Sequence, residues 1–546
     1  MKKKYLLLLA ILSGVLLSLA WPARGFPFLL FVAFVPLLYI EDFISKNKHN
    51  FIRSSVFFFS YIAFFIWNFL TTWWIYYSTS FGAAMAIVFN ALFMTLAFFA
   101  YHVVRRTVLK SRGGLYILIF FWITFEFLHL DWDLSWSWLN LGNGFANYPE
   151  LIQWYEYTGV FGGDLWILLI NILVYKLLLR AFGKYRSRKS VYIYGSSIVL
   201  LLLIPIASSL IVYYTYKEKE QPYECVVVQP NIDPYNEKFG GMTIQQQLDK
   251  IFNLAKQKIN KNTDFLVCPE TAIPEYINEN EINEYESIDS LKSLIKKYPK
   301  LKIVIGISSF KIYKDGEKLS RTARYATNQH YYYDVCNTAL YLDSMMIPQL
   351  YHKSKLVPGV EMMPFPKLLK PLEDFAIDLG GMTGSNCTQD ERSVFGAKNS
   401  PVKVAPVICY ESIYGDFMSG YIRNGANLIF IITNDGWWNN TAGHRQHMQY
   451  ARLRAVEFRR SIARSANTGI SAFINQRGDV FQPTTYWTPN VIEMKINGNN
   501  KITLYAQFGD YIGRIAMYLT VITFVIFIAS IILNKRKRIK IKKDNK

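Results

Sequence analysis

The chain has 546 residues, of which 51% are hydrophobic and 16% aromatic, and its formal net charge is +20. This composition is too apolar for an ordinary soluble enzyme, so membrane-spanning segments are expected. The positive charge does not indicate a nucleic-acid partner, because much of it lies in clusters that flank apolar runs.

Eight apolar runs are long enough to be considered as membrane-spanning helices, which need about 20 residues to cross a bilayer core. In chain order they are 5–21, 26–40, 52–77, 82–103, 114–130, 162–180, 191–214 and 511–533. The first resembles a signal peptide, but further spans follow it, so we expect an uncleaved anchor. The fifth contains Glu126, and an ionisable group within a membrane is costly and often functional. These runs predict a polytopic α-helical membrane bundle of about eight helices.

Basic residues indicate how these helices are oriented. They cluster at 2–4, 46–53, 105–112, 176–189 and 535–546. If all five clusters face the cytoplasm, the opposite loops contain one basic residue, Arg24, against four acidic ones, as the positive-inside rule requires. Both termini are then cytoplasmic. The predicted parts are a membrane domain with seven helices over 1–215, an outward-facing domain over 216–508, and an eighth helix with a basic tail over 509–546.

The outward-facing stretch alternates short β-rich runs with helical patterns. The β-rich runs include "ECVVVQPN", "DFLVCPE", "KIVIGISSF", "VKVAPVICYES" and "NLIFIITND", and a long helical pattern is "TIQQQLDKIFNLAKQKIN". Continuously apolar strands are typical of sheets that are covered on both faces, so the stretch is predicted to form an α/β domain.

Three segments of this domain place polar side chains where strands are expected to end. "FLVCPETAIPEY" contains Glu270, "YHKSKLVPGVEMMPF" contains Lys353 and Glu361, and "APVICYES" contains Cys409 and Glu411. Catalytic groups of α/β domains gather at the carboxyl ends of strands, because the loops there are free to vary. Taken singly, each residue has a simpler interpretation as a turn residue, a solvated lysine or an inert packed cysteine.

The motifs together resemble the nitrilase superfamily. They are PETAIP, then Y-x-K-x-x-L-V-P-x-x-E-x-x-P, then ICYE, then TNDGWW followed by Q-H-x-x-x-A-R-x-R-A-x-E, all within about 224–480. With seven spans before this region and one after it, the chain more closely resembles the apolipoprotein N-acyltransferase family. The resemblance implies that the outward-facing domain is a nitrilase-like α-β-β-α sandwich.

The Glu-Lys-Cys triad of that superfamily matches Glu270, Lys353 and Cys409. A thiol with an ordinary pKa of about 8.5 is a poor nucleophile at neutral pH and needs a base or a nearby cation. Glu270 is expected to take the thiol proton, provided that burial raises the pKa of its carboxyl. Lys353 is expected to lower the pKa of the thiol and to donate to the oxyanion of a tetrahedral intermediate.

Other residues are expected to support this triad. The backbone N–H of Tyr410 is a second oxyanion donor, Glu361 holds the Lys353 ammonium, and Glu411 is a second residue that could orient it. A segment over 362–400 is expected to form a lid that faces the membrane. Candidate substrate contacts are apolar or aromatic: Phe239, Met362, Met363, Phe365, Trp437 and Trp438.

The reaction that the resemblance implies has two steps. An acyl chain of a phospholipid becomes a thioester on the cysteine, and the α-amine of S-diacylglyceryl-cysteine at the N-terminus of an apolipoprotein then takes it. The expected partners are therefore a phospholipid donor, an apolipoprotein acceptor and the bilayer, with no nucleic acid. The expected location is the bacterial inner membrane, crossed several times, with a periplasmic catalytic domain in a monomeric protein.

No cofactor or metal is expected. There is no Gly-rich phosphate loop, and His444 with His447 is only an i, i+3 pair within the helix motif.

The sequence departs from the family pattern in places. The usual P-F-G-E order is Pro358-Gly359-Val360-Glu361 here, which alters the backbone of that loop, and Phe239 stands where a Trp is usual. Among the five cysteines, Cys225, Cys268 and Cys336 are expected to be buried free thiols. Cys387 lies in a loop and could pair with another cysteine.

Two rival functions share some of these features. A membrane-tethered nitrilase-type amidohydrolase would use the same triad with water as the acceptor, but eight spans exceed what a tether requires. A polytopic transporter with an accessory domain would explain Glu126 and would leave the motifs unexplained.

Overall fold

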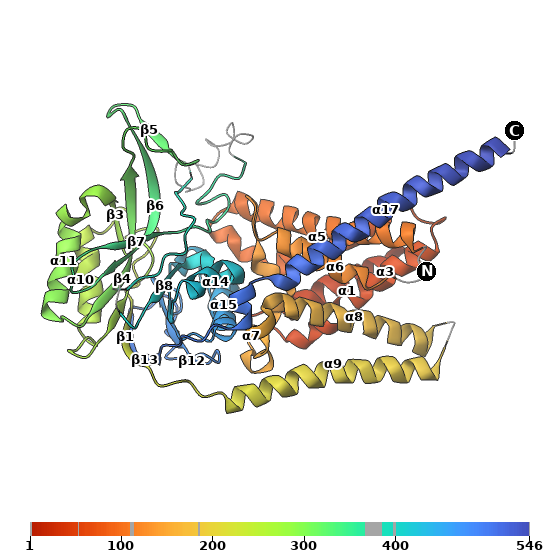
Figure 1. Cartoon of the computed structure of the whole chain (residues 1–546), viewed down its shortest axis with the longest axis horizontal. Coiled ribbons are helices and arrows are strands. Elements are labelled where there is room, and N and C mark those ends of the chain that lie inside the picture. Colours follow the sequence, from red (N-terminus) through yellow and green to blue (C-terminus); the bar gives the residue numbers. More distant parts are fainter. Residues whose placement is uncertain are drawn as a thin grey trace. The chain divides into compact units, whose positions relative to one another are not determined.

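The computed structural model describes residues 3–52, 54–109, 114–183, 186–365, 385–396 and 400–544, without the side chains of 537–543 (Figure 1). Most of the predicted lid over 362–400 lies outside these residues. The chain divides into two compact units. Met1–Trp73, Ala83–Ile211 and Asp510–Lys546 form the first unit, and Trp74–Gly82 and Val212–Gly509 form the second. The predicted domain boundaries stay a prediction, because packing alone does not place a membrane.

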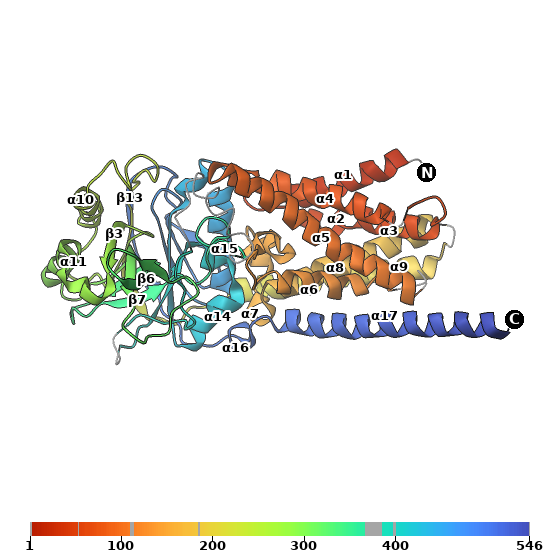
Figure 2. The same ribbon diagram turned by 90° about the horizontal axis from the view of Figure 1, so that it is seen from above.

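The first unit is built from helices. They are α1 (Lys3–Leu19), α2 (Leu30–Ala33), α3 (Val35–Lys46), α4 (Ser55–Thr72), α5 (Ser80–Val108), α6 (Ile117–Leu128), α7 (Tyr155–Thr158), α8 (Val160–Phe182), α9 (Arg188–Thr215) and α17 (Tyr511–Asp544). Within this unit α1 packs against α3 and α4, and α17 packs against α6 (Figure 2). The α1–α4 contact is close, because a Cβ on Gly14 would lie 2.5 Å from the carbonyl oxygen of Ala63.

Six helical segments of the described chain are long and apolar enough to cross a membrane. They are Pro27–Lys46, Ser55–Tyr77, Ser80–Val108, Val160–Phe182, Arg188–Thr215 and Tyr511–Arg536. Each corresponds to one of the eight predicted runs. The other two runs form shorter helices, α1 with 17 residues and α6 with 12. These helices fit a membrane protein, and the count of eight stays a prediction.

Glu126 is buried in α6 and has protein partners. Its Oε1 accepts hydrogen bonds from Nε1 of Trp122 at 2.7 Å and from the backbone N–H of Leu141 at 3.2 Å. The neighbouring Gly142 N–H donates to Oδ1 of Asp164, which is buried in α8. The two acidic residues therefore hold the turn at Leu141–Phe145 against α6 and α8.

The second unit contains two β-sheets. The first sheet comprises β1 (Pro222–Gln229), β2 (Phe265–Val267), β3 (Ile273–Asn278), β4 (Lys302–Ile312), β5 (Arg324–Ala326), β6 (Tyr331–Leu342), β7 (Gln349–His352) and β13 (Asn490–Asn497). The second sheet comprises β8 (Val404–Ile408), β9 (Leu428–Thr433), β10 (Ile462–Ala466), β11 (Ala472–Ile474) and β12 (Val480–Phe481). The strand orders are β13-β1-β2-β4-β6-β5, with β3 on β4 and β7 on β6, and β12-β11-β10-β9-β8.

Helices cover the outer faces of both sheets. They are α10 (Ile244–Ala255), α11 (Glu286–Lys297), α14 (Gly415–Arg423) and α15 (Ala442–Phe458), and the short α16 (Leu504–Phe508) follows β13. Strand β1 shows why the layers form. Cys225 and Val227 belong to the core between the sheets, whereas Val226 and Val228 pack with α10 and α11. Because successive side chains point to opposite faces, a continuously apolar strand is buried on both, and the predicted α-β-β-α sandwich is confirmed.

Parallel strands bring the polar residues to common sheet edges. β1, β2 and β4 are parallel, as are β8, β9 and β10. Cys409 comes directly after β8 and Asn434 directly after β9, and Glu270 is the third residue after β2, so all three lie at strand carboxyl ends. Gly306 of β4 allows Glu270 to lie close, since a Cβ there would be 2.4 Å from the Thr271 nitrogen and 2.6 Å from the Glu270 Cα.

Gly306→Ala is expected to destabilise the second unit, because the clashing atoms belong to the backbone. Overpacking of this kind costs about 1–3 kcal/mol. Thermal unfolding of the purified protein in detergent would measure the loss. Gly240→Ala is the matched control, because nothing lies within 4 Å of its Cβ position and it should unfold like the wild type. Equal unfolding temperatures for both variants would contradict the close approach.

Candidate active site

A buried ammonium between two carboxylates lies at the centre of the site. Nζ of Lys353, just beyond β7, donates to Oε1 of Glu270 at 3.0 Å and to Oε1 of Glu361 at 2.7 Å. Lys353 is 1% exposed and Glu270 is 5% exposed. Burial alone lowers the pKa of Lys353, but Glu270 and Glu361 raise it well above its ordinary value, so the amine is charged.

Glu270 is held at every oxygen. Its Oε1 also accepts from Nδ2 of Asn337 at 2.8 Å, its Oε2 accepts from the backbone N–H of Asn434 at 3.0 Å, and its carbonyl accepts from Nζ of Lys238 at 3.1 Å. Burial alone raises the pKa of this carboxyl, but the charge of Lys353 and the hydrogen bonds from Lys353 and Asn337 lower it below its ordinary value. The expectation that burial lifts the pKa of Glu270 is therefore wrong: donors outweigh desolvation.

Cys409 occupies a sharp turn between a strand and a helical turn. β8 ends at Ile408, and the 3₁₀ turn Cys409–Ile413 starts with Cys409 at a φ of 51°, in the left-handed region. Burial and the charge of Glu270 raise the pKa of its thiol well above its ordinary value, against the opposing charge of Lys353. The thiol of Cys409 therefore interacts electrostatically with both Glu270 and Lys353. Lys353 acts to lower the pKa of the thiol, as expected, but burial and Glu270 raise it by more, so the resting thiol is protonated.

Glu411 holds the backbone around the nucleophile. Its Oε2 accepts from the Ile408 N–H at 2.8 Å, and its Oε1 accepts from Tyr351 Oη and from the Ser354 N–H, both at 2.7 Å. It thus joins the residue before Cys409 to the residue after Lys353, and orients Lys353 only through the backbone. Tyr410, the predicted oxyanion donor, is the buried second residue of the 3₁₀ turn.

A buried polar network lies beside the nucleophile. His447 of α15 meets Oγ of Ser412 at 2.9 Å and the Cys409 carbonyl at 3.2 Å through Nε2, and Oδ1 of Asp435 at 2.9 Å through Nδ1. A guanidinium nitrogen of Arg464 donates to Oδ2 of Asp435 at 2.7 Å. Burial alone raises the pKa of Asp435, but Arg464 and His447 lower it far below its ordinary value. The network therefore carries a fixed carboxylate and holds the carbonyl of Cys409.

The predicted substrate contacts fall into two groups. Trp437 and Trp438 pack with the segment Trp74–Gly82, which belongs to this unit. The Trp74 and Trp438 rings are 4.9 Å apart, and Nε1 of Trp74 donates to Oε1 of Gln446 at 3.2 Å. Phe239 and Phe365 are exposed, while Met362 and Met363 are half-buried. Their contact with a substrate stays a prediction.

Two residues of the site were not expected from the sequence. Asn337, in the middle of β6, donates to Glu270 and lies 3.4 Å from Oε1 of Glu361. Lys238 is buried beside Glu270, and burial lowers its pKa to about 8, although the charge of Glu270 acts in the opposite direction. A polar residue within an otherwise apolar strand could have indicated Asn337 from the sequence. Lys238 lies in a polar stretch of the sequence, where nothing distinguishes it from a solvated lysine.

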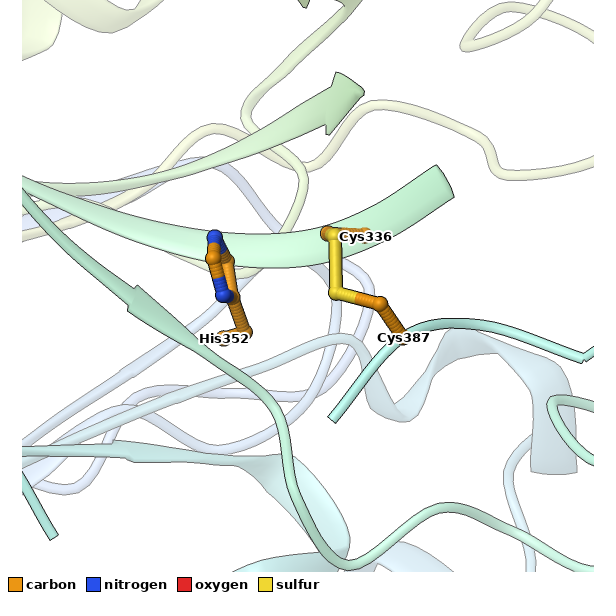
Figure 3. Close-up of side chains that lie close together, drawn as sticks. All are labelled: Cys336, His352 and Cys387. Carbon is orange, nitrogen blue, oxygen red and sulfur yellow. A yellow bond between two sulfur atoms is a disulfide. The ribbon is translucent and has the colours of Figure 1, made fainter. Parts of the chain in front are cut away.

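The cysteines differ from the expectation in one pair. Cys336 and Cys387 form a disulfide, so the prediction of a free thiol at Cys336 is wrong, and Cys387 is the loop residue that pairs with it (Figure 3). Cys225 and Cys268 are buried and free, as predicted.

Two groups in the described residues have the composition of a metal site. They are Cys336, His352 and Cys387, and Cys409, Asp435 and His447. The first has its sulfurs bonded to each other, and the second has its imidazole and carboxylate in the network described above.

Comparison with known proteins places both parts of the chain. Residues 13–173 match the family described as the apolipoprotein N-acyltransferase N-terminal domain, and residues 227–500, half of the chain, match carbon-nitrogen hydrolase. The apolipoprotein N-acyltransferase of Chlorobaculum tepidum is 27% identical over 93% of this chain and 94% of that protein. Apolipoprotein N-acyltransferase 1 of Treponema denticola is 24% identical over 98% of both.

Among solved structures, Saccharomyces cerevisiae Nit3, a member of branch 10 of the nitrilase superfamily, covers 54% of this chain and 95% of its own. Its TM-score is 0.35 at 14% identity. The carbon-nitrogen hydrolase match covers most of the second unit, and the N-terminal match accompanies it in one chain. The chain therefore belongs to the carbon-nitrogen hydrolase family, joined to the N-terminal domain of the apolipoprotein N-acyltransferases.

Proposed function

We propose that this protein transfers an acyl chain from a phospholipid, through a thioester on Cys409, to the α-amine of S-diacylglyceryl-cysteine in an apolipoprotein. The observation that carries the proposal is the buried Glu270–Lys353–Glu361 group, within the electrostatic reach of a cysteine at a strand end. Its occurrence in a chain with both family domains and six apolar helices supports a lipid substrate.

In the acylation step, the thiol of Cys409 attacks the ester carbonyl of the phospholipid. At rest Lys353 uses two of its three N–H donors on Glu270 and Glu361, and during the attack it turns toward the developing oxyanion, to which the Tyr410 N–H also donates. Glu270 takes the thiol proton as the sulfur–carbon bond forms. As Lys353 turns toward the oxyanion it releases Glu270, whose pKa then rises, so the carboxyl becomes a better base when it is needed.

The intermediate then collapses by breaking the bond to the lipid oxygen. Glu270 returns its proton to that oxygen, a lysophospholipid leaves, and the thioester remains. In the transfer step the acceptor α-amine attacks the thioester carbonyl and Glu270 takes an amine proton. Glu270 then gives this proton to the sulfur as the carbon–sulfur bond breaks, which leaves an amide and the Cys409 thiol. Four groups of the chain thus suffice for both steps, with Glu361 and Asn337 as positioning residues.

The membrane arrangement is part of the proposal. Basic clusters beside the apolar helices support eight crossings, cytoplasmic termini and a catalytic unit in the periplasm of a bacterial inner membrane. A disulfide in the catalytic unit supports an oxidising compartment. The amidohydrolase alternative requires no membrane bundle, and the transporter alternative assigns no role to the buried triad.

Cys409→Ser is expected to leave the protein folded and to abolish N-acylation, because a hydroxyl there has no sufficiently strong base to form the acyl-enzyme. Mass spectrometry of a lipoprotein substrate would measure the third acyl chain. The matched control is Cys225→Ala, which removes a buried free thiol from β1 and should keep activity. A third acyl chain made by the serine variant would show that the nucleophile is elsewhere.

Incubation with phospholipid alone is expected to add one acyl mass to the protein, removable by hydroxylamine. Glu270→Gln should lower the rate of this labelling by about 100- to 10,000-fold, because the amide cannot take the thiol proton. The exposed Glu284→Gln is the control and should label normally. Normal labelling of the Glu270 variant would exclude it as the base.

The pH dependence of acylation follows from the lowered pKa of Glu270. The base form is the carboxylate, which exists above its pKa, so activity should persist as the pH falls to about 4.5, the ordinary value for a glutamate, and be lost only below it. Single-turnover labelling across pH 4–9 would measure this, because no acceptor amine titrates in that step. An acid limb centred above pH 6 would contradict the assignment.

A further inference from the structure

The Cys336–Cys387 disulfide lies next to the residues that hold the triad. Cys336 is in β6 and precedes Asn337, and Cys387 lies 51 residues later in the chain. Both are buried, with exposed fractions of 2% and 5%. Asn337 donates to Glu270, and its carbonyl accepts from the Lys353 N–H at 2.8 Å. One end of the bond is therefore one residue away from a direct contact with the proposed base.

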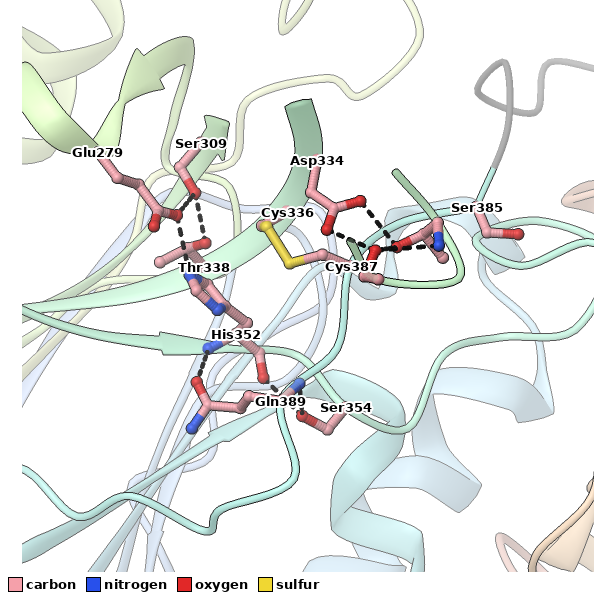
Figure 4. The surroundings of a disulfide bond; sticks show 12 residues. Glu279, Ser309, Asp334, Cys336, Thr338, His352, Ser354, Ser385, Cys387 and Gln389 are labelled. Atoms are coloured by element: carbon pink, nitrogen blue, oxygen red, sulfur yellow. Dashed lines mark hydrogen bonds and ion pairs between the residues drawn. A yellow bond between two sulfur atoms is a disulfide. The ribbon is translucent and has the colours of Figure 1, made fainter. Parts of the chain in front are cut away.

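The other end belongs to a segment that braces the site, residues 385–389, which we name the brace segment. The Asn386 N–H donates to the Glu361 carbonyl at 2.9 Å, and the Cys387 N–H donates to the Val335 carbonyl at 2.7 Å. Oε1 of Gln389 accepts from the His352 N–H at 2.8 Å (Figure 4). The brace segment thus contacts Glu361 itself and the residue before Lys353.

No regular strand holds the brace segment in place. Residues 385–389 have no helix or strand assignment, and their contacts to the rest of the unit are single hydrogen bonds, each of which contributes little net stability. The disulfide is the covalent link between this segment and β6 (Figure 4). Opening it would remove the covalent link and leave the brace segment joined to Val335, His352 and Glu361 by hydrogen bonds.

We propose that the Cys336–Cys387 disulfide is a positioning element for catalysis, which holds Asn337 and Glu361 against Glu270 and Lys353, so that the acylation rate depends on its oxidised state. This inference rests on the proposed function. Loss of the bond loosens the donors around Glu270, and a misplacement near 1 Å at such a site costs up to about 100-fold in rate. Stability alone does not account for this role, because the neighbours of the two cysteines, Asn337 and Asn386, contact Glu270 and Glu361.

The test compares Cys336→Ser, Cys387→Ser and the double variant with the wild type in single-turnover acylation from phospholipid. Each variant lacks the same bond, so all three should be slower by about 10- to 100-fold and equal to one another within about twofold. Rates are referred to the fraction of folded protein. Cys225→Ala, which leaves the bond intact, should react at the wild-type rate.

A pH profile separates positioning from stability. Because Lys353 and Asn337 lower the pKa of Glu270, loosening them should move the acid limb of acylation to higher pH in all three variants. A merely stabilising bond would lower the unfolding temperature and leave both the rate per folded molecule and the acid limb unchanged. That result, or single-variant losses that multiply in the double variant, would overturn the proposal.

Chemical reduction gives an independent arm. A trialkylphosphine is suitable because it does not attack thioesters: the phosphine becomes a phosphine oxide with oxygen from water, and the disulfide becomes two thiols. The reduced wild type should acylate at the rate of the double variant, and the rate of the double variant should not change on reduction.

A chelator is included, because the freed sulfurs and His352 could bind a metal. If the wild type forms no thioester in either redox state, the proposed function is wrong. If it forms the thioester at equal rates with and without the disulfide, only the positioning role is wrong.

Discussion

The site depends on the burial of one ammonium. A buried charge without partners costs several kcal/mol, so Lys353 needs counter-charges. Glu270 supplies one from a segment 83 residues away, and Glu361 supplies the other from the loop eight residues after Lys353. The requirement draws the end of β2, the end of β7 and the loop beyond Lys353 to one point. The same pairing lowers the pKa of Glu270, so the constraint that builds the site also keeps its base ionised.

The proposed nucleophile depends on a second constraint, the left-handed backbone of Cys409. For a residue with a side chain this conformation costs about 1–2 kcal/mol, so the surroundings must over-determine it. Glu411 holds the Ile408 N–H before the turn, and His447 holds the Cys409 carbonyl after it. Asp435 and Arg464 in turn hold His447, which explains why fully buried charged residues persist in an apolar core. The helix motif around His447 therefore helps to fix the backbone conformation of Cys409.

Local patterns predicted an α/β domain and the segments that carry the site, because apolar runs and strand ends are short-range properties, whereas the α-β-β-α sandwich was implied by the family resemblance. Contacts between residues that are far apart in the chain could not be predicted from local patterns. The pairing of Cys336 with Cys387 spans 51 residues, and nothing in the local sequence selects one partner for a loop cysteine. The sign of the Glu270 shift also could not be predicted, since it depends on how many donors surround the carboxyl. Asn337 is recognisable in the sequence as a polar residue within an apolar strand, but its partner Glu270 is known only once β6 is placed beside it.

A protonated, buried thiol suits a chain that also forms a disulfide. The thiolate is the form that oxidises and exchanges with disulfides, so the raised pKa of Cys409 and its low exposure keep it reduced while Cys336 and Cys387 pair. The nucleophile must then be activated by its substrate. In the proposed mechanism, an ester carbonyl that draws the Lys353 ammonium toward its oxygen frees Glu270 to take the thiol proton, so deprotonation and attack occur together. Reactivity is thereby confined to the moment when a carbonyl occupies the site.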